Sequence, residues 1–510
     1  MENKCLKTSV YVNENVFSDS CEQPIDVDFT LPDYCPDISK IFKCRAFARI
    51  SSKGINGKNI TVDGSVCITV LYADKDNNLC SYEYQYPFSK IKEMPNECSG
   101  ANLCCSVKCE YINCRAVTGR KVDIHGAVGI NIRVFKRKSN DVISDYDDCN
   151  IELRRAVAPA TVPMGYAEKY IIIEDEIAIS NATAPIQSVL RYDAVPSVKE
   201  SKIINDKIVV KGDMAVTILY CSEGSAVPQV MKTTLPFSQI VEMQGVTDLC
   251  ECETKAYLAF LEIKPRMAQN GENRCFSLMA KVLLSCESYC VNDIPVIQDA
   301  FSTKFETNII KDNITFSKIC HNIKEICQFK KNVEVSENIS SVIDLWCDVQ
   351  SKSVKFEGSN LIVCATFMVF FVVCDEDNNV SFYEKPIDFE YKFPITDTDR
   401  PMQCNPDIDI TSTGFTITSA NTIDLRLDVL VNASVYEKTK MSLITDLEVD
   451  KNRPTMRKGN GAMTIYFTNK DECVWDIART YNASVEDIMT MNDLKDECLK
   501  EGTMILVPIV

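Results

Sequence analysis

Cysteine is the residue type with the most capacity for chemistry in this chain, since 26 of its 510 residues are cysteines. Close cysteine or histidine pairs could bind zinc, and opposed thiols could form disulfides. The densest group is Cys104, Cys105, Cys109 and Cys114, yet no Cys-x-x-Cys pair occurs in the chain. Structural zinc sites usually need two such pairs. We therefore expect no metal site, and mostly reduced thiols that serve as small apolar side chains.

Catalytic chemistry has few candidates. His125 and His321 are the only histidines, so one of them would have to activate a serine or cysteine nucleophile. His125 lies in an alternating segment typical of an ordinary strand, and no Gly-x4-Gly-Lys-Ser/Thr phosphate loop is present. The carboxylates of Asp145, Asp147 and Asp148 are predicted to lie in a solvated loop. The residue types therefore predict a protein that is not an enzyme and needs no cofactor.

Charge and hydropathy limit the partners. The net charge is −17 without a basic stripe, which disfavours nucleic acid and anionic lipid. The longest apolar run, Leu361–Cys374, is too short to span a bilayer and suits a strand that is buried on both faces. The opening Met1-Glu-Asn-Lys-Cys lacks the pattern of a secretory signal peptide. We therefore expect a protein of the cytosol that is not inserted into membranes.

The elements that position these residues are repeated along the chain. The segment Ile60–Tyr72 matches Ile208–Tyr220 at a constant offset, so that Gly64 falls on Gly212. The match resumes at a Pro-Phe-Ser sequence, predicted as a turn, which begins at residue 87 in the first copy and 236 in the second. A third copy follows, in which residues 374–379 match residues 73–78. A period of about 150 residues fits a whole domain per copy.

Each copy has the pattern of a mainly β domain. Val66, Ile68 and Val70 alternate with less apolar residues, and residues 76–78 predict a turn before another strand. Short helices are expected where the copies open, because Ile38, Ile41 and Phe42 have helical spacing. The predicted fold class is mainly β, with three repeated sandwich-like or barrel-like domains at 1–165, 166–310 and 311–445.

The opening of the first copy is its most specific sequence. It contains Leu31-Pro-Asp-Tyr-Cys-Pro-Asp-Ile38, ahead of the glycine-containing strand and the Pro-Phe-Ser sequence. These features resemble the SPOCS domain, which is found in spore coat proteins of Clostridia and related spore formers. The second copy keeps the last two features, and the third is the most diverged.

The C-terminal segment has a different pattern. Residues 446–461 are polar and basic and predict a flexible linker. Beyond it, Val474, Ile477, Ala478 and Tyr481 give the buried stripe of one helix, and Ser484 is the predicted N-cap of a second. Flanking short strands complete a small βααβ unit at 462–510. This unit resembles the LysM family, whose members mostly bind N-acetylglucosamine polymers.

The resemblance also indicates where this module would bind. Sugar-binding LysM domains carry a Gly-Asp-Thr/Ser turn before the first helix, where this chain has Asp471-Glu-Cys473. The aspartate replaces a glycine that enters positive φ at low cost, and the cysteine replaces a hydroxyl. Trp475 lies off the buried stripe, so it is either a partly exposed contact for a protein partner or a side chain that packs against the linker or a strand edge. We take the partly exposed contact as the prediction. The predicted binding surface comprises Asp471, Glu472, Cys473, Trp475, Asn492, Leu494 and Gly502.

SPOCS repeats followed by a LysM domain resemble the SipL-like family of spore coat morphogenetic proteins. The resemblance implies a non-enzymatic scaffold of the mother-cell cytoplasm at the forespore surface and in the spore coat. Its LysM domain would dock a coat morphogenetic ATPase of the SpoIVA type, and its SPOCS domains would contact further coat proteins. The alternative is a peptidoglycan-binding protein of the cell wall or spore cortex.

Overall fold

The structure is a computed structural model that describes residues 4–148, 150–180, 182–225, 227–267, 271–377, 379–396, 400–455 and 461–508. Most of these residues lie in strands, which confirms the mainly β fold class. The strands of the first copy are β1 (Lys4–Thr30), β2 (Lys40–Asn56), β3 (Asn59–Ala73), β4 (Leu79–Glu93), β5 (Asn102–Ala116) and β6 (Lys121–Asp147).

The second copy has β7 (Ile151–Ala178), β8 (Ile186–Ile204), β9 (Lys207–Ser222), β10 (Gln229–Glu242), β11 (Glu251–Met267) and β12 (Asn273–Ser302). The third has β13 (Phe305–Glu334), β14 (Ser341–Glu357), β15 (Asn360–Cys374), β16 (Val380–Pro394), β17 (Met402–Cys404), β18 (Asp407–Ser419) and β19 (Thr422–Pro454).

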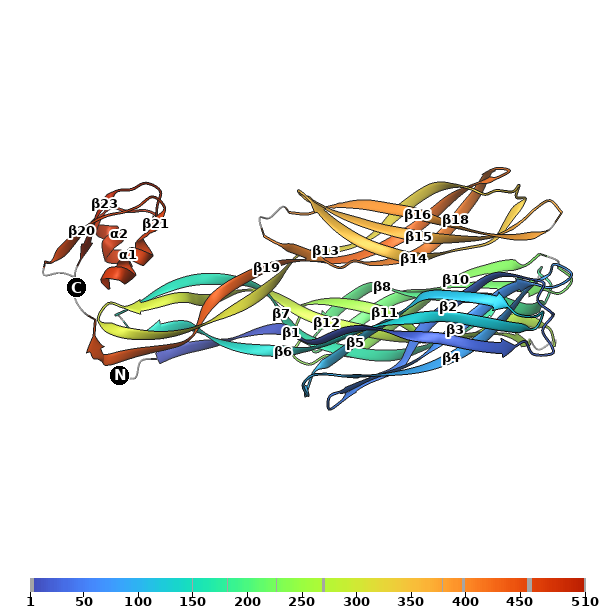
Figure 1. Cartoon of the computed structure of the whole chain (residues 1–510), viewed down its shortest axis with the longest axis horizontal. Helices are drawn as coiled ribbons and strands as arrows, with labels where there is room; N and C mark the ends of the chain where they lie inside the picture. Colours follow the sequence, from blue (N-terminus) through green and yellow to red (C-terminus); the bar gives the residue numbers. More distant parts are fainter. Residues whose placement is uncertain are drawn as a thin grey trace.

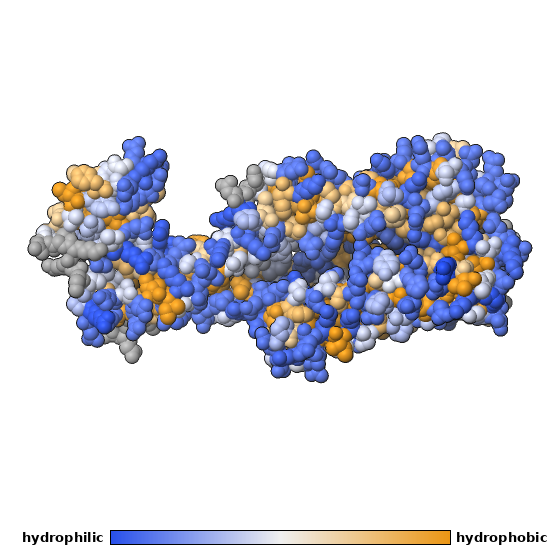
Figure 2. Space-filling view, viewed as in Figure 1, coloured by the Kyte–Doolittle hydropathy of each residue, from blue (hydrophilic) through white to orange (hydrophobic). Residues whose placement is uncertain are grey.

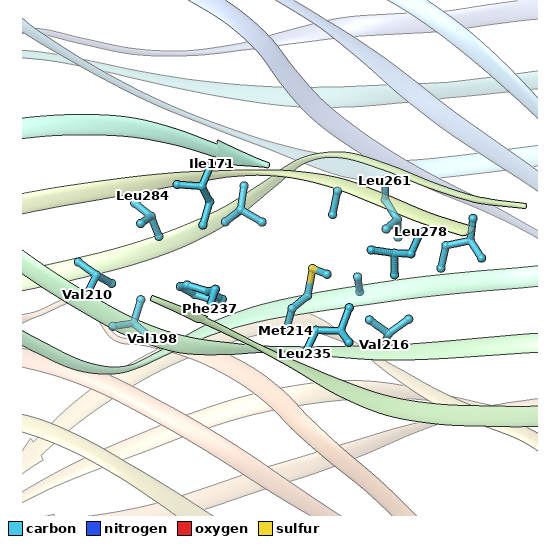
Figure 3. Packing of buried hydrophobic residues seen from close by; sticks show 14 of the residues in the cluster. Ile171, Val198, Val210, Met214, Val216, Leu235, Phe237, Leu261, Leu278 and Leu284 are labelled. Atoms are coloured by element: carbon cyan, nitrogen blue, oxygen red, sulfur yellow. The ribbon is translucent and has the colours of Figure 1, made fainter. Parts of the chain in front are cut away.

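Each copy folds into two antiparallel sheets with the same strand order. The first copy forms β1-β6-β5 and β2-β3-β4, the second β7-β12-β11 and β8-β9-β10, and the third β13-β19-β18 and β14-β15-β16. Within a copy the two sheets bury one shared apolar core. Figure 3 shows the core of the second copy, where Met214 and Phe237 lie between Leu235 and Leu284 among the labelled side chains.

A glycine opposite a phenylalanine recurs in the first two copies. Gly64 pairs with Phe88 in the first, and Gly212 pairs with Phe237 in the second. In both, a Cβ on the glycine would collide with the phenylalanine ring, which covers the strand where the side chain is missing. The correspondence between Gly64 and Gly212 that the sequence predicts is therefore preserved in three dimensions.

The third copy repeats the turn of the first. Asp74 Oδ1 accepts hydrogen bonds from the backbone N–H groups of Asp76 and Asn78 at 2.9 and 2.8 Å. Asp375 Oδ1 accepts the same two bonds from Asp377 and Asn379, also at 2.9 and 2.8 Å. The carboxylate satisfies the turn's N–H groups before the next strand begins. The predicted match between the first and third copies therefore holds as well.

Six strands extend beyond the sheets and form what we call the stalk, comprising residues 4–14, 136–147, 151–163, 289–302, 305–318 and 437–454. Figure 1 shows them running to the left, towards the N-terminus and the C-terminal module. Each copy contributes one antiparallel ribbon. The three ribbons bury a common core that includes Val10, Ala160, Val296, Phe316 and Leu443.

The rest of the three copies, which we call the head, is joined by buried polar contacts. Arg45 of the first copy pairs with Asp193 of the second at 3.0 Å and with Asp348 of the third at 2.5 Å. Arg191 of the second copy pairs with Asp344 of the third at 2.7 Å. Because each copy contacts both others, the inward faces of the sheets are covered, and a buried strand such as β15 is apolar on both faces.

Several local expectations were wrong. The predicted helices at the openings are strands, since Ile41 and Phe42 lie in β2, where pairing with β3 outweighs the helical spacing. The Pro-Phe-Ser sequences lie within β4 and β10 rather than in turns. Asp145 and Asp147 belong to β6, not to a loop. In each case a strand partner distant in sequence satisfies the backbone.

The predicted linker is also mostly strand. Residues 446–454 pair with the start of β13 in the stalk, and residues 456–460 lie outside the described part of the chain. The predicted limits at 165/166 and 310/311 fall inside β7 and β13. The C-terminal module follows as β20 (Met463–Phe467), β21 (Glu472–Cys473), α1 (Val474–Tyr481), α2 (Val485–Met491), β22 (Cys498–Leu499) and β23 (Met504–Pro508).

Candidate functional site

The two helices of the C-terminal module pack on a two-stranded sheet as the sequence predicts. Val474, Ile477 and Ala478 of α1 are buried, and Ile488 of α2 joins them. Ser484 caps α2, where its hydroxyl accepts a 3.5 Å hydrogen bond from the backbone N–H of Asp487. The pattern of apolar residues is enough to form these helices because each buries one stripe.

Trp475 is buried, contrary to the expectation of partial exposure. Its side chain is 3 % exposed and packs edge-on against Phe301 of β12, with 5.1 Å between ring centroids. Its indole Nε1–H donates a 2.9 Å hydrogen bond to Asp299 of the same strand. The side of α1 that lacks a partner inside the module therefore packs on the stalk.

Asp299 is the centre of this contact. Besides Trp475, its carboxylate accepts hydrogen bonds from Arg479 of α1 at 2.6 Å and from Lys311 of β13 at 2.7 Å. Burial by itself would raise the pKa of Asp299, but the bonds from Lys311 and Trp475 and the charge of Arg479 outweigh it and hold the pKa below its usual value. Local sequence could not reveal this contact, because it joins residues 176 positions apart.

The turn before α1 is held by bonds within the module. Asp471 adopts a left-handed backbone with φ of 63°, which aspartate tolerates better than most residues, so replacement of the glycine does not prevent the turn. Glu472 accepts from the Tyr466 hydroxyl at 2.7 Å. The backbone N–H of Asp471 donates to the backbone carbonyl of Leu499 at 2.7 Å. Cys473 of β21 lies opposite Cys498 of β22 in the antiparallel strand pair. The turn before α1 and strand β22 are thus bonded to each other.

The other three predicted surface residues have different positions. Asn492 joins α2 to β23, because its side-chain amide donates to the Ile488 and Leu506 carbonyls at 2.8 and 2.7 Å and accepts from the Leu506 N–H. Leu494 is half-buried against the module core. Gly502 is exposed. The seven predicted residues therefore differ in accessibility, from the buried Trp475 to the exposed Gly502, and their role in binding stays a prediction.

An exposed apolar sheet face was missed by the sequence analysis. Met463, Ile465 and Phe467 alternate along β20 with exposed fractions of 55, 59 and 73 %, and Met504 of β23 opposite Phe467 is 56 % exposed. Figure 2 shows orange atoms on the outer side of the module, at the upper left. The sequence contained the signal, because successive residues of a strand point to opposite faces of the sheet. Ile505 and Val507 of β23 fill the module core, so Met504 and the β20 residues on its side of the sheet lie on the outer face.

Thiols meet in pairs in the described residues, where Cys44 lies within hydrogen-bond reach of Cys114 and Cys252 of Cys286. Cys250 and Cys290 form a disulfide, and most of the other described cysteines carry free thiols. No group of three potential ligand side chains that could hold a metal ion is found there. The ring nitrogens of His125 lie 3.2 Å from the carboxylates of Asp26 and Asp123, and His321 Nε2 accepts a hydrogen bond from the backbone N–H of Thr396.

Comparison with known proteins identifies two kinds of domain. A family model described as the SPOCS domain of SipL matches residues 37–117 and 185–265, and a LysM domain model matches residues 469–508. No curated protein and no solved structure matches the chain. No helix in the described ranges is long and apolar enough to cross a membrane. These two domain families are not catalytic, and together they indicate a sporulation coat protein with a module of the peptidoglycan-binding type.

Proposed function

We propose that this chain, whose SPOCS and LysM domains make it a SipL-like protein, is a scaffold that docks a coat morphogenetic ATPase of the SpoIVA type on the forespore surface. The docking element is the LysM module. The head, including its diverged third copy, holds further coat proteins. The protein acts from the mother-cell cytoplasm.

The exposed sheet face of β20 and β23 carries this proposal. Residues paired across an antiparallel sheet lie on the same face, so Met463, Ile465, Phe467 and Met504 form one apolar surface. Such a surface offers few hydrogen-bonding side chains to the hydroxyl and acetamido groups of a glycan, whereas aromatic and methionine side chains are enriched at the centres of protein interfaces. A protein partner is therefore the better fit.

The position of the module supports the same conclusion. Since α1 faces the stalk through Trp475 and Arg479, the exposed sheet face is on another side of the module. A partner can therefore contact β20 and β23 while the module stays seated. The stalk would then hold the partner at the opposite end of the molecule from the head (Figure 1).

Peptidoglycan binding is the alternative function, and it rests on the LysM family match. Against it, the turn at Asp471 and the loop at Leu499 are bonded to each other, so fewer backbone groups are free for an acetamido sugar. The same turn has a cysteine, Cys473, in place of a hydroxyl donor, and its Sγ lies 3.9 Å from Arg154 of the stalk.

Binding measurements on the full chain distinguish the two functions. We expect Phe467→Asp to weaken binding of the purified ATPase by about 2 kcal/mol or more, the size of a hot-spot truncation. Met491→Asp is the matched control, because Met491 is also exposed and apolar but lies on α2. Chitin oligomers are titrated in parallel.

Full ATPase affinity in Phe467→Asp, or equal losses in both variants, would exclude the sheet face as the docking surface. Tight chitin-oligomer binding without ATPase affinity would favour the alternative function. A thermal melt of each variant shows whether the fold is retained.

A further inference from the structure

A cleft in the head lies where the three copies meet. Its volume is about 410 Å³, within the range of small-molecule sites. β5 of the first copy, β8 and β11 of the second, and β13, β14, β18 and β19 of the third all line it. Neither matched domain family assigns a role to this cleft, since it exists only when the three copies are assembled.

The charge of the cleft is opposite to that of the protein. The whole chain carries a net charge of −17. Of the side chains lining the cleft that carry a full charge at neutral pH, four are lysines and two are aspartates: Lys108, Lys255, Lys324 and Lys352, with Asp407 and Asp409. Positive potential in a concave site with low-dielectric walls attracts anions more strongly than the same charges on an open surface.

Two of the lysines have no carboxylate partner within the described residues. Lys108 Nζ donates to the backbone carbonyl of Gln350 at 2.8 Å, and Lys324 Nζ donates to that of Lys199 at 3.3 Å. Each bond crosses from one copy to another and so fixes the position of the ammonium group. A carbonyl satisfies one of the three ammonium donors but leaves the charge uncompensated.

The aspartates of the cleft do not neutralise the positive charge of all four lysines. Asp407 is shared between Lys255 and Lys352, with the latter at 3.2 Å, and Lys255 also pairs with Glu253 at 3.1 Å. These carboxylates compensate Lys255 and Lys352 but not Lys108 or Lys324. Burial raises the pKa of Asp409, and the neighbouring charge of Asp407 adds to that rise. Burial also lowers the pKa of Lys324, which means that its charged form lacks a compensating group.

We infer that this cleft binds a small organic polyanion, with phosphate or carboxylate groups on Lys108 and Lys324 and an apolar body against the remaining wall. Val107, Val198 and Ile408 supply that wall. The volume exceeds what a lone inorganic anion would fill. The site is independent of the docking surface on β20 and β23, because it lies in the head.

Calorimetric titration of the full chain at low ionic strength tests the inference, with pyrophosphate, citrate and ATP as separate titrants. The variant carries Lys108→Gln and Lys324→Gln together. Lys90→Gln is the matched control, because Lys90 Nζ also donates to a carbonyl, that of Glu22 at 3.1 Å, but lies outside the cleft. We expect saturable binding that weakens roughly tenfold or more in the double variant and is unchanged in the control.

A second measurement needs no substitution and so does not depend on how the variants fold. Lysine acylation of the unaltered protein, followed by mass spectrometry, should show Lys108 and Lys324 protected by the bound titrant and Lys90 unprotected. Absence of saturable binding for all three titrants, or equal affinity in the double variant and the control, would overturn the inference. Stronger binding of ATP and pyrophosphate than of citrate would identify phosphate as the recognised group, and the reverse would identify carboxylate.

Discussion

The contact between Trp475 and Asp299 gives the sharpest test of how the LysM module is seated. Trp475→Phe removes the indole N–H that donates to Asp299 but keeps an aromatic ring against Phe301. Hydrogen bonds to charged groups contribute about 1.5–3 kcal/mol, so we expect the seated state to lose about 2 kcal/mol. Trp475→Ala also removes the ring contact, which adds about 0.5–1.5 kcal/mol beyond the lost buried area.

The measurement is hydrogen exchange of the α1 amides in the full chain, which reports the free energy of opening for that segment. Asp299→Ala completes a double-mutant cycle with Trp475→Phe. Because the two side chains touch, their effects should fall short of additivity by about 1–3 kcal/mol. Additive effects within about 0.5 kcal/mol would show that Trp475 and Asp299 do not meet in solution, and the seated arrangement would be wrong.

Three further predictions concern pH, packing and thiols. The pKa of Asp299 is lowered, so its contribution to seating is complete above its unfolded pKa of about 3.9 and is lost as the pH falls through the folded value. The free energy of α1 opening, obtained from exchange rates corrected for the intrinsic pH dependence of amide exchange, should therefore fall in acid and stay constant near neutral pH. Gly64→Ala should destabilise the first copy by about 1–3 kcal/mol in denaturant unfolding, since the new Cβ meets the Phe88 ring, whereas Gly54→Ala has open space and should be tolerated. Thiol titration of the denatured, unreduced protein should find most cysteines reactive and the Cys250–Cys290 pair protected; a majority of protected thiols would contradict the expectation of a reducing compartment.

The sequence by itself determined the repeated units and their strands. Its internal matches place Gly212 on Gly64 and Asp375 on Asp74, and the structure preserves both relations. Period-two alternation identified β3 and the part of β6 around His125, a period-3.6 stripe identified α1, and the Ser484 N-cap identified the start of α2. These features are local, because burial of one face requires a regular spacing of apolar residues along the chain.

Only the tertiary structure decided how those units combine. Ile41 has helical spacing but pairs in β2, and residues 446–454 have a linker composition but pair with β13, because a partner strand far along the chain supplies their hydrogen bonds. Trp475 looked free on its own helix, yet it is covered by Asp299 and Phe301 of another domain. A sequence shows which face a segment can bury within its own unit, but not which remaining faces other units will cover, since those contacts depend on the three-dimensional assembly of all three copies.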